Sequence, residues 1–370
     1  MILRIATFNA ENLFRRPKAF GLPDGTQRQE VLDDFLELVS LLDLPTYTAA
    51  DKERIGRLIL KHRAYAIDPD NPPPIYINQI RPGREAGLFK PPPAHPDHID
   101  VTAKGRGAWA GWAELTQDDL DENAVRNTGR VVAEVDADIL LMPEVEDRLT
   151  LERFNRQILA GALGRRPYPY NMLIDGNDSR GIDIGILSRH PITSIRSHVF
   201  DPDPERPGEH LFSRDCPEFE IRFNGTPLVL LGNHLKSKSN DDPALRLAQA
   251  RRVAQIHQAA LERSPYVMVA GDLNDDLDSE PVAALLDTGL RDAMSHPAYA
   301  GELRGTHGKC EARDKLDYLL FPPPLWHRIQ HVGLETRGIF EQPKPFDTVT
   351  SKATEASDHA ALYADLDLDL

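Results

Sequence analysis

The sequence has little cysteine, no long apolar run and no excess of basic charge, and each absence excludes a class of protein. Its two cysteines, Cys216 and Cys310, lie far apart and in no paired spacing. This excludes a disulfide framework or a thiolate zinc site as the organising feature of the fold. Because disulfides are rare in reducing compartments, we expect two free, buried thiols rather than one bridge.

The absence of any run of about 18 apolar residues predicts that no helix crosses a membrane. The first residues, MILRIATFNAENLF, contain neither the apolar core nor the small-residue cleavage site of a secretory signal. The sequence therefore predicts a soluble, cytoplasmic protein with no membrane span, and it indicates no obligate protein partner.

The charge balance is acidic, with 43 Lys and Arg against 58 Asp and Glu and a formal net charge of −15. A broad surface that binds polyanions needs Lys and Arg to neutralise phosphates, so such a surface is disfavoured. Phosphate chemistry carried out through bound metal ions remains compatible with this balance. With 370 residues, of which 41% are hydrophobic, the chain has enough apolar material for a folded core.

Short apolar segments bounded by Gly, Pro or Asp alternate with segments of helical periodicity, which predicts a layered α/β or α+β fold. The segment Asp68–Gly107 is rich in proline and is not expected to form regular structure. It is either a long surface loop or a flap that gates the substrate. The expected helices are Gln29–Leu42, Ala50–Ala66, Asp118–Val135 and Ala244–Glu262, and the expected strands are Ile2–Phe8, Ile139–Met142, Ile182–Leu187, Pro227–Gly232, Tyr266–Ala270, Leu316–Phe321 and Ala360–Leu366.

Six of the expected strands carry a carboxylate, amide or imidazole at one end. Taken singly, each has an ordinary explanation, since Asp or Asn after a strand is usually a turn former. Together they predict one pocket, where carboxylate oxygens suit Mg²⁺ or Mn²⁺ and imidazoles transfer protons near neutral pH. The residues concerned are Asn9, Glu11, Glu144, Asn233, His234, Lys236, Asp272, Asn274, Asp317, Asp358 and His359.

Seven short motifs, taken in order, resemble the endonuclease/exonuclease/phosphatase superfamily. They are FNAENLF, MPEVED, GIDIGILSR, GNHLKSKS, AGDLND, KLDYLL and SDHAAL. The resemblance covers residues 1–14 and about 130–366 and is nearest to the deoxyribonuclease-like, bacterial nuclease-like branch. It implies a four-layer α/β (α+β) sandwich, in which two mixed β-sheets pack face to face between helices and the active site lies at one edge.

The resemblance also implies a role for each matching residue. Glu144 matches the family's principal metal ligand, Asn9 its partner near that metal, and Asp358 a further metal-site aspartate. His359 matches the histidine at the site of attack, and Asp317 matches the aspartate that orients its ring. The cofactor implied is Mg²⁺ or Mn²⁺.

Further residues match groups that contact the phosphate. Asp272 matches the aspartate placed on the nucleophilic or leaving oxygen, and Asn274 the residue that holds the phosphate. His234 matches a second histidine that contacts the scissile phosphate or acts as an acid. The remaining candidates for substrate binding are Lys236, Arg180 and Asn233.

Two of the neighbouring residues have competing interpretations. Arg180 either reaches a phosphate or forms a surface salt bridge. His307 follows Thr306 where relatives often have an aromatic residue, so it is a candidate to stack on the substrate or hydrogen-bond to it.

The spacing between Asn9 and Glu144 departs from the family, because the two are 135 positions apart. The family needs only a helix between these motifs, on the order of thirty residues. We therefore expect a single domain over residues 1–370, interrupted by an insertion at about 16–112. Since the insertion leaves a strand end at the active-site edge, it is predicted to pack near the pocket and to disfavour open duplex DNA as a substrate.

Three functional hypotheses remain open at this stage. The leading one is a divalent-metal-dependent phosphodiesterase, in which activated water attacks in line, with a phosphodiester substrate and nucleic acid as the first candidate. The second is a phosphatase or phosphodiesterase acting on a small-molecule, inositol or lipid phosphoester. The third is an inactive binding module of the same fold, which is weakened because no matched catalytic position is lost.

Overall fold

The computed structural model describes residues 1–11, 13, 15–21, 25–66, 72–80, 87–90, 96–119, 121–178, 180–238 and 242–368. The chain divides into two compact units. Unit 1 comprises Met1–Phe14 and Leu120–Leu370, and unit 2 comprises Arg15–Asp119.

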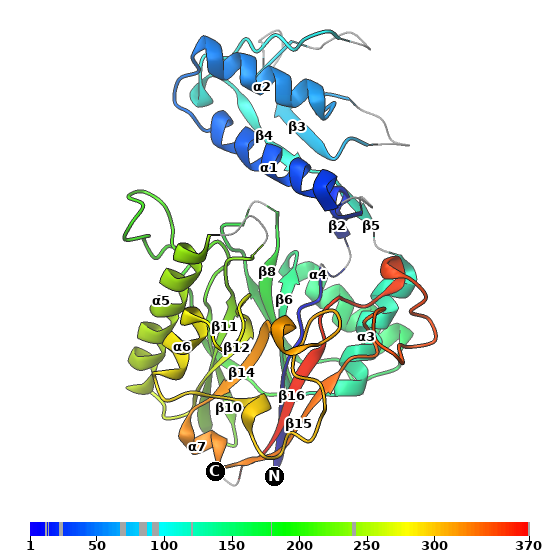
Figure 1. The fold of residues 1–370 in the computed structure, drawn as a ribbon, viewed down its shortest axis with the longest axis vertical. Coiled ribbons are helices and arrows are strands. Elements are labelled where there is room, and N and C mark those ends of the chain that lie inside the picture. The colour runs from blue at the N-terminus through cyan, green and yellow to red at the C-terminus, as the bar shows by residue number, and fades with distance from the viewer. Residues whose placement is uncertain are drawn as a thin grey trace. The chain divides into compact units, whose positions relative to one another are not determined.

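The first six-stranded sheet of unit 1 has the order β15-β16-β1-β6-β8-β7. It is mixed, because β1 pairs parallel with β6 and antiparallel with β16. The two ends of the chain, in blue and red, therefore run side by side within this sheet (Figure 1). Its strands are β1 (Ile2–Thr7), β6 (Ile139–Val145), β7 (Tyr170–Ile174), β8 (Asp183–Ser188), β15 (Ile329–Glu335) and β16 (Ala361–Asp367).

The second sheet of unit 1 has the order β13-β14-β12-β11-β10-β9. It is also mixed, since β11 and β12 are parallel whereas the other pairs are antiparallel. Its strands are β9 (Ile192–Arg196), β10 (Glu218–Phe223), β11 (Thr226–His234), β12 (Val267–Asp272), β13 (Arg291–Asp292) and β14 (Asp317–Phe321).

The two sheets share one apolar core, and each has a second core on its outer face. Alternate residues of β12 show the division, since Met268 and Ala270 belong to the core between the sheets and Val267 and Val269 to the outer core under α5. Helices cover both outer faces (Figure 1). This confirms the expected four-layer sandwich of two mixed sheets between helices. The helical elements of unit 1 are α3 (Glu122–Val135), α4 (Arg148–Arg153), the π-helical η3 (Phe154–Ala162), α5 (Pro243–Leu261), α6 (Glu280–Leu286), η4 (Ala293–Ser295), η5 (Ala312–Asp314), α7 (Pro323–Trp326) and η6 (Lys352–Thr354).

Local sequence explains where α5 begins and which face it buries. The Asp242 side chain accepts a hydrogen bond from the Leu245 amide at 3.0 Å, and Pro243 occupies the first turn. Both features favour a helix start. Val253, Ile256 and other residues spaced three or four apart are buried against the second sheet.

Unit 2 has an apolar core of its own, in which Phe35 and Leu38 of α1 join Ile55 and Leu58 of α2. Two small two-stranded sheets, β2-β5 and β3-β4, complete it. Its elements are β2 (Arg15–Pro17), η1 (Lys18–Gly21), α1 (Gly25–Leu42), α2 (Ala49–Lys61), β3 (Ile75–Ile80), η2 (Arg106–Ala108), β4 (Ala110–Leu115) and β5 (Gln117–Asp119).

Two expectations about secondary structure are wrong. The proline-rich segment Asp68–Gly107 contains the strand β3, whose Ile75 and Ile77 are buried in the core of unit 2. The helix expected from Asp118 begins only at Glu122, because residues 117–119 pair with β2 instead.

Two expectations about the cysteines and the membrane can also be compared with the structure. Cys216 and Cys310 are free and buried, as expected. Among the described residues, no helix combines the length and the apolar character needed to cross a membrane.

Candidate active site

Strand alternation places three of the predicted residues on the same face of the second sheet. Leu230 of β11, Ala270 of β12 and Leu319 of β14 all belong to the core between the sheets. Since side chains alternate along a strand, residues an even number of positions away share that face. His234, Asp272 and Asp317 meet this condition and lie at the strand ends.

Strand register then brings these three side chains next to one another. In the parallel pair β11-β12, His234 lies opposite Asp272. In the antiparallel pair β12-β14, Asp272 lies opposite Asp317. His234 Nε2 is 3.7 Å from Asp272 Oδ2, and all three residues are buried.

A distorted strand end directs Glu144 into the same place. The β6-β8 register shifts between Pro143 and Val145, and Glu144 between them has a φ of 63°. This left-handed conformation costs a non-glycine residue about 1–2 kcal/mol, and bulges of this kind re-aim side chains near functional sites. Glu144 Oε1 lies 3.7 Å from His234 Nε2.

Asn9 links the two sheets at this edge. Its amide nitrogen donates to Glu144 Oε1 at 3.3 Å and to Asp272 Oδ2 at 3.2 Å. Its oxygen accepts from the Glu11 backbone amide at 3.0 Å. In this arrangement Asn9 holds the two carboxylates together, and its role as a metal ligand stays a prediction.

His359 and Asp317 form a buried hydrogen-bonded pair. His359 Nδ1 lies 2.7 Å from Asp317 Oδ2, and the Thr306 hydroxyl donates to the same oxygen at 2.7 Å. The other ring nitrogen, Nε2, lies 3.9 Å from Asp272 Oδ2 and 3.8 Å from Asp358 Oδ1. Asp317 therefore fixes the ring so that Nε2 faces the other carboxylates.

The packing of these groups shifts their proton affinities. Burial, reinforced by the charge of Asp317, raises the pKa of Asp272 to about 7. Burial lowers the pKa of His359, but the charge and hydrogen bond of Asp317 and the charges of Asp272 and Asp358 outweigh it, so the net pKa lies well above the usual value. Burial and the charges of nearby guanidinium groups hold the pKa of His234 well below its usual value. In the cation-free site the surroundings therefore favour the protonated form of His359 and the neutral form of His234.

Asp358 lies on the far side of His359 and contacts His307. His307 Nε2 is 3.4 Å from Asp358 Oδ2, and the two histidine rings meet edge to face with centroids 4.9 Å apart. Burial raises the pKa of Asp358, but the hydrogen bond from His307 and the charge of His359 outweigh burial and the net pKa is lowered. The Asp358 amide also donates to Glu11 Oε2 at 3.2 Å.

A cationic group that the sequence interpretation missed borders the site. The buried Arg214 places Nε 3.0 Å from Asp178 Oδ2, and Arg180 binds both oxygens of the same carboxylate at 2.9 and 2.7 Å. Burial and the charges of these two arginines lower the pKa of Lys236. No local pattern marks Arg214, because its partner Asp178 is remote in sequence and lies outside any motif.

Two predicted residues beside the site have other contacts. Asn274, with a φ of 53°, donates its backbone amide to Asp272 Oδ1 at 2.8 Å and its side-chain amide to Leu235 O at 3.1 Å. Asn233 faces away from His234 because neighbouring residues alternate, and its side chain donates to Leu231 O. Among the described contacts, none joins Asn233 to another candidate residue.

The donor set fits a divalent cation. Glu144 and Asp272 approach each other through Asn9, and burial beside the charge of Asp317 raises the pKa of Asp272, a negative environment that a bound cation would relieve. Among the described residues, Asp317 Oδ1 is buried without a hydrogen-bond partner. Oxygen donors of this kind suit hard divalent ions.

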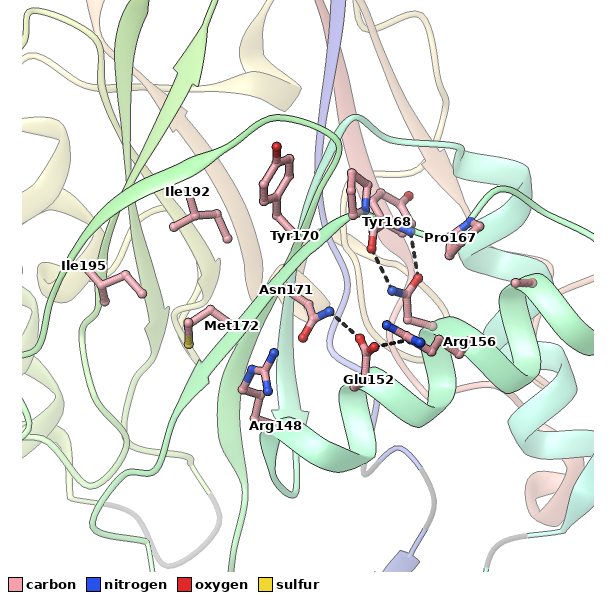
Figure 2. Close-up of a pocket in the computed structure, with 13 residues that line it drawn as sticks. Arg148, Glu152, Arg156, Pro167, Tyr168, Tyr170, Asn171, Met172, Ile192 and Ile195 are labelled. Carbon is pink, nitrogen blue, oxygen red and sulfur yellow. Dashed lines mark hydrogen bonds and ion pairs between the residues drawn. The ribbon is translucent and has the colours of Figure 1, made fainter.

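A separate hollow of about 550 Å³ lies between α4, η3 and the edge strands β7 and β9 (Figure 2). Asn171 donates to Glu152 on its helical side. The hollow lies at the end of the sheet away from the candidate site. Tyr170, which lines it, and Ile139 at the start of β6 both pair with Ser188, whereas Val145 beside Glu144 pairs with Asp183. The lining also includes Arg148, Arg156, Met172, Ile192 and Ile195.

Comparison with known proteins gives one family match. Residues 106–359 match the Endonuclease/Exonuclease/phosphatase family. None of the curated proteins compared with the chain matches it.

Solved structures with a similar fold share little sequence with this chain. Truncated TDP2 of Caenorhabditis elegans is 20% identical, covers 66% of this chain and 91% of its own, and has a TM-score of 0.47. A Bacteroides thetaiotaomicron protein of the endonuclease/exonuclease/phosphatase family is 18% identical, with coverages of 67% and 90% and a TM-score of 0.49. Mannosyl-6-phosphatase from Bacteroides thetaiotaomicron is 16% identical, with coverages of 66% and 92% and a TM-score of 0.50, a likeness of fold alone.

Proposed function

The chain belongs to the Endonuclease/Exonuclease/phosphatase family, and from this premise we propose that it is a Mg²⁺- or Mn²⁺-dependent phosphodiesterase, with nucleic acid as its first candidate substrate. The observation that carries this proposal is the register of β11, β12 and β14, which lines up His234, Asp272 and Asp317. His359 and Glu144 complete the group from the other sheet.

Glu144 and Asp272, with Asn9 and Asp358, are the residues proposed to hold the ion. When bound, a divalent ion polarises the phosphate and offsets negative charge in the transition state. The side-chain amide of Asn9 must rotate before its oxygen can bind the ion, because that oxygen now accepts a hydrogen bond from the Glu11 backbone amide.

A divalent cation bound beside Asp272 and Asp358 would offset the negative charges that raise the pKa of His359. The ring, then neutral at Nε2, is proposed to accept the proton of the attacking water there. Asp317 holds its Nδ1 and stabilises the positive charge that the ring gains. His234, on the other side of Asp272, is placed to contact the phosphate or the leaving oxygen. Burial favours the neutral form of His234 in the cation-free site. A neutral ring can donate a hydrogen bond to the phosphate as it stands, whereas it would first have to gain a proton to act as an acid.

Arg180, Arg214 and Lys236 are proposed to bind the phosphate oxygens. Two guanidinium groups share the single carboxylate of Asp178, which leaves an excess of positive charge at this point. Charged donors of this kind form the stronger hydrogen bonds to phosphate. The burial that lowers the pKa of Lys236 is offset when an anion binds beside it.

The test is a substrate panel with the purified chain. We expect hydrolysis of bis(p-nitrophenyl) phosphate with Mg²⁺ or Mn²⁺ and its loss on chelation. Single-stranded DNA, RNA and plasmid are compared in parallel for nuclease activity. No turnover of any phosphoester with either ion would overturn the proposal and favour an inactive binding module.

The second candidate is a phosphatase or phosphodiesterase acting on a small-molecule, inositol or lipid phosphoester. The net charge of −15 favours it, because an acidic surface disfavours long polyanions. The mannosyl-6-phosphatase of similar fold acts, by its name, on such a compound. Turnover of sugar or lipid monoesters without turnover of diesters would select this candidate.

A further inference from the structure

His307 and Asp358 lie together at the mouth of the site, outside the group formed by Glu144, Asp272 and His234. The side chains of His307 and Asp358 are 38% and 27% exposed, so an ion from solvent can reach them. His307 Nε2 and Asp358 Oδ2 are 3.4 Å apart. Neighbouring ligands of one divalent ion, each about 2.1 Å from it, are about 3 Å apart in octahedral geometry.

The backbone fixes this pair. His307 and His359 form an isolated antiparallel bridge. On either side of it, the Gly308 amide donates to Asp358 O at 2.8 Å and the Ala360 amide to Thr306 O at 2.6 Å. His307 and Asp358 are therefore presented by adjacent chain segments and not by a free loop tip.

The charges around this pair are of both signs, since the protonated His359 and Lys352 act on Asp358 from the cationic side and Glu11 from the anionic side. Glu11 Oε2 accepts from the Asp358 amide and adds a carboxylate beside it. The Lys352 ammonium is occupied by two other carboxylates, with Nζ 3.2 Å from Glu355 Oε1 and 3.7 Å from Glu341 Oε1.

The geometry points to a second divalent-cation position at His307 Nε2 and Asp358 Oδ2, one that takes Mn²⁺ in preference to Mg²⁺. A mixed imidazole and carboxylate pair suits a transition-metal ion, whereas Mg²⁺ favours oxygen ligands alone. Only two protein ligands are needed, because water and substrate phosphate oxygens complete the coordination of such ions. His359 keeps Nε2 for the reaction and is not one of the ligands. Asp358 would serve both ions, with Oδ2 at this position and Oδ1 toward the principal ion, and the second ion would replace the hydrogen bond that His307 now makes to Asp358.

The purpose of the second ion rests on the proposed function, whereas its binding is measured without substrate and is independent of turnover. The tests use the full chain with Glu144→Gln, which weakens the principal ion position, and compare it with the same chain carrying also His307→Phe. Calorimetric titration with Mn²⁺ and with Mg²⁺ gives both affinities, and pulsed electron paramagnetic resonance of bound Mn²⁺ detects nitrogen coordination.

We expect the Glu144→Gln chain to bind Mn²⁺ more tightly than Mg²⁺ and to show nitrogen coupling. His307→Phe should remove that coupling and weaken Mn²⁺ binding about ten-fold or more, with little effect on Mg²⁺. The matched control is His331→Phe, since His331 Nδ1 also lies near a carboxylate, 3.8 Å from Asp365 Oδ2, but Arg4 already neutralises that carboxylate.

Two results would overturn the inference. The first is loss of all Mn²⁺ binding in Glu144→Gln, and the second is unchanged nitrogen coupling after His307→Phe. Either leaves the proposed function intact if the wild-type chain still hydrolyses a phosphoester. Circular dichroism checks folding, and His307→Gln, which keeps a polar side chain but no imidazole, replaces His307→Phe if the latter fails to fold.

Discussion

Asp272 stands at the centre of the candidate site, because two strand registers converge on it and its side chain is buried among other candidate residues. His234 and Asp317 lie opposite it on the neighbouring strands, and Asn9 donates to it from the other sheet. Its pKa is raised to about 7 by burial and by the charge of Asp317, so a cation bound beside it would favour the ionised form. At the residue scale, this supports the proposal of a divalent-cation site.

Asp317 offers the sharpest test of the proposed proton transfer. Asp317→Asn keeps the volume and leaves a side-chain oxygen or nitrogen facing His359 Nδ1, but it removes the charge that stabilises the imidazolium. We expect kcat on bis(p-nitrophenyl) phosphate to fall by about 10²–10⁴-fold with the fold retained. The control is Asp347→Asn, a surface aspartate that pairs with Arg130. A kcat equal to that of wild type would remove Asp317 from the mechanism.

Asp183 provides a prediction of pH dependence. Burial raises its pKa from 3.8 to about 7, against a hydrogen bond from the Gly176 amide. Between these values the unfolded chain binds fewer protons than the folded chain, so stability falls as pH rises from about 4 to about 7. Asp183→Asn should remove the part of this loss that Asp183 contributes, whereas the part due to Asp272, whose pKa is also raised to about 7, should remain. Urea unfolding of the cation-free chain at pH 5 and pH 8 measures the change in the free energy of unfolding. The same change in Asp183→Asn as in the wild-type chain would contradict a raised pKa of Asp183.

Sequence reasoning located most of these residues because each stands at one end of a buried strand. The seven motifs then gave their expected roles by resemblance, whereas the strand registers that bring His234, Asp272 and Asp317 together come from the tertiary fold. Arg214 could not be found this way, since its significance comes from Asp178, a partner that only the tertiary fold brings near.

At the scale of elements, the parallel contact between β11 and β12 depends on Gly271. Its φ is 124°, and a Cβ at this position would lie 1.9 Å from Asn233 O. We expect Gly271→Ala to lower the free energy of unfolding by about 2–4 kcal/mol. Gly161→Ala is the control, because its Cβ meets nothing closer than Arg156 O at 3.4 Å. Equal urea midpoints for the two variants would show that the β11-β12 contact tolerates a side chain.

Several strands that the sequence analysis missed lack a continuous apolar signal like that of β6 or β12. Strands β7, β9 and β15 have partly exposed residues, and in the mostly buried β10 the apolar residues alternate with charged ones, EFEIRF. In β3, prolines nearby masked a strand that packing in unit 2 stabilises. Both errors arise because tertiary burial, which a single sequence does not display, decides these segments.

At the scale of the whole molecule, the acidic net charge and the cationic cluster of Arg180, Arg214 and Lys236 work on different length scales. The cluster is local and is proposed to bind one phosphate group, whereas a net charge of −15 repels a long polyanion. We therefore expect activity on nucleic acid to favour short or single-stranded substrates over duplex DNA, and the sequence-based hypothesis that the insertion restricts entry predicts the same preference.

Unit 2 provides the means to separate these two effects. Its ends lie side by side, because Arg15–Pro17 pairs with Gln117–Asp119, so a short Gly/Ser linker can replace residues 15–119. Unit 1 has its own cores and should stay folded. If the insertion restricts entry, hydrolysis of bis(p-nitrophenyl) phosphate should stay close to that of the full chain while cleavage of duplex DNA rises.

The comparison uses kcat/KM for the small diester, a short single strand and a duplex at equal ionic strength, with circular dichroism to verify the fold. If duplex cleavage stays low in the shortened chain but rises with added salt, the repulsion by surface charge limits the substrate, since salt screens it. Unchanged duplex cleavage under both conditions would show that neither barrier governs substrate choice, and that the shape of the site in unit 1 does.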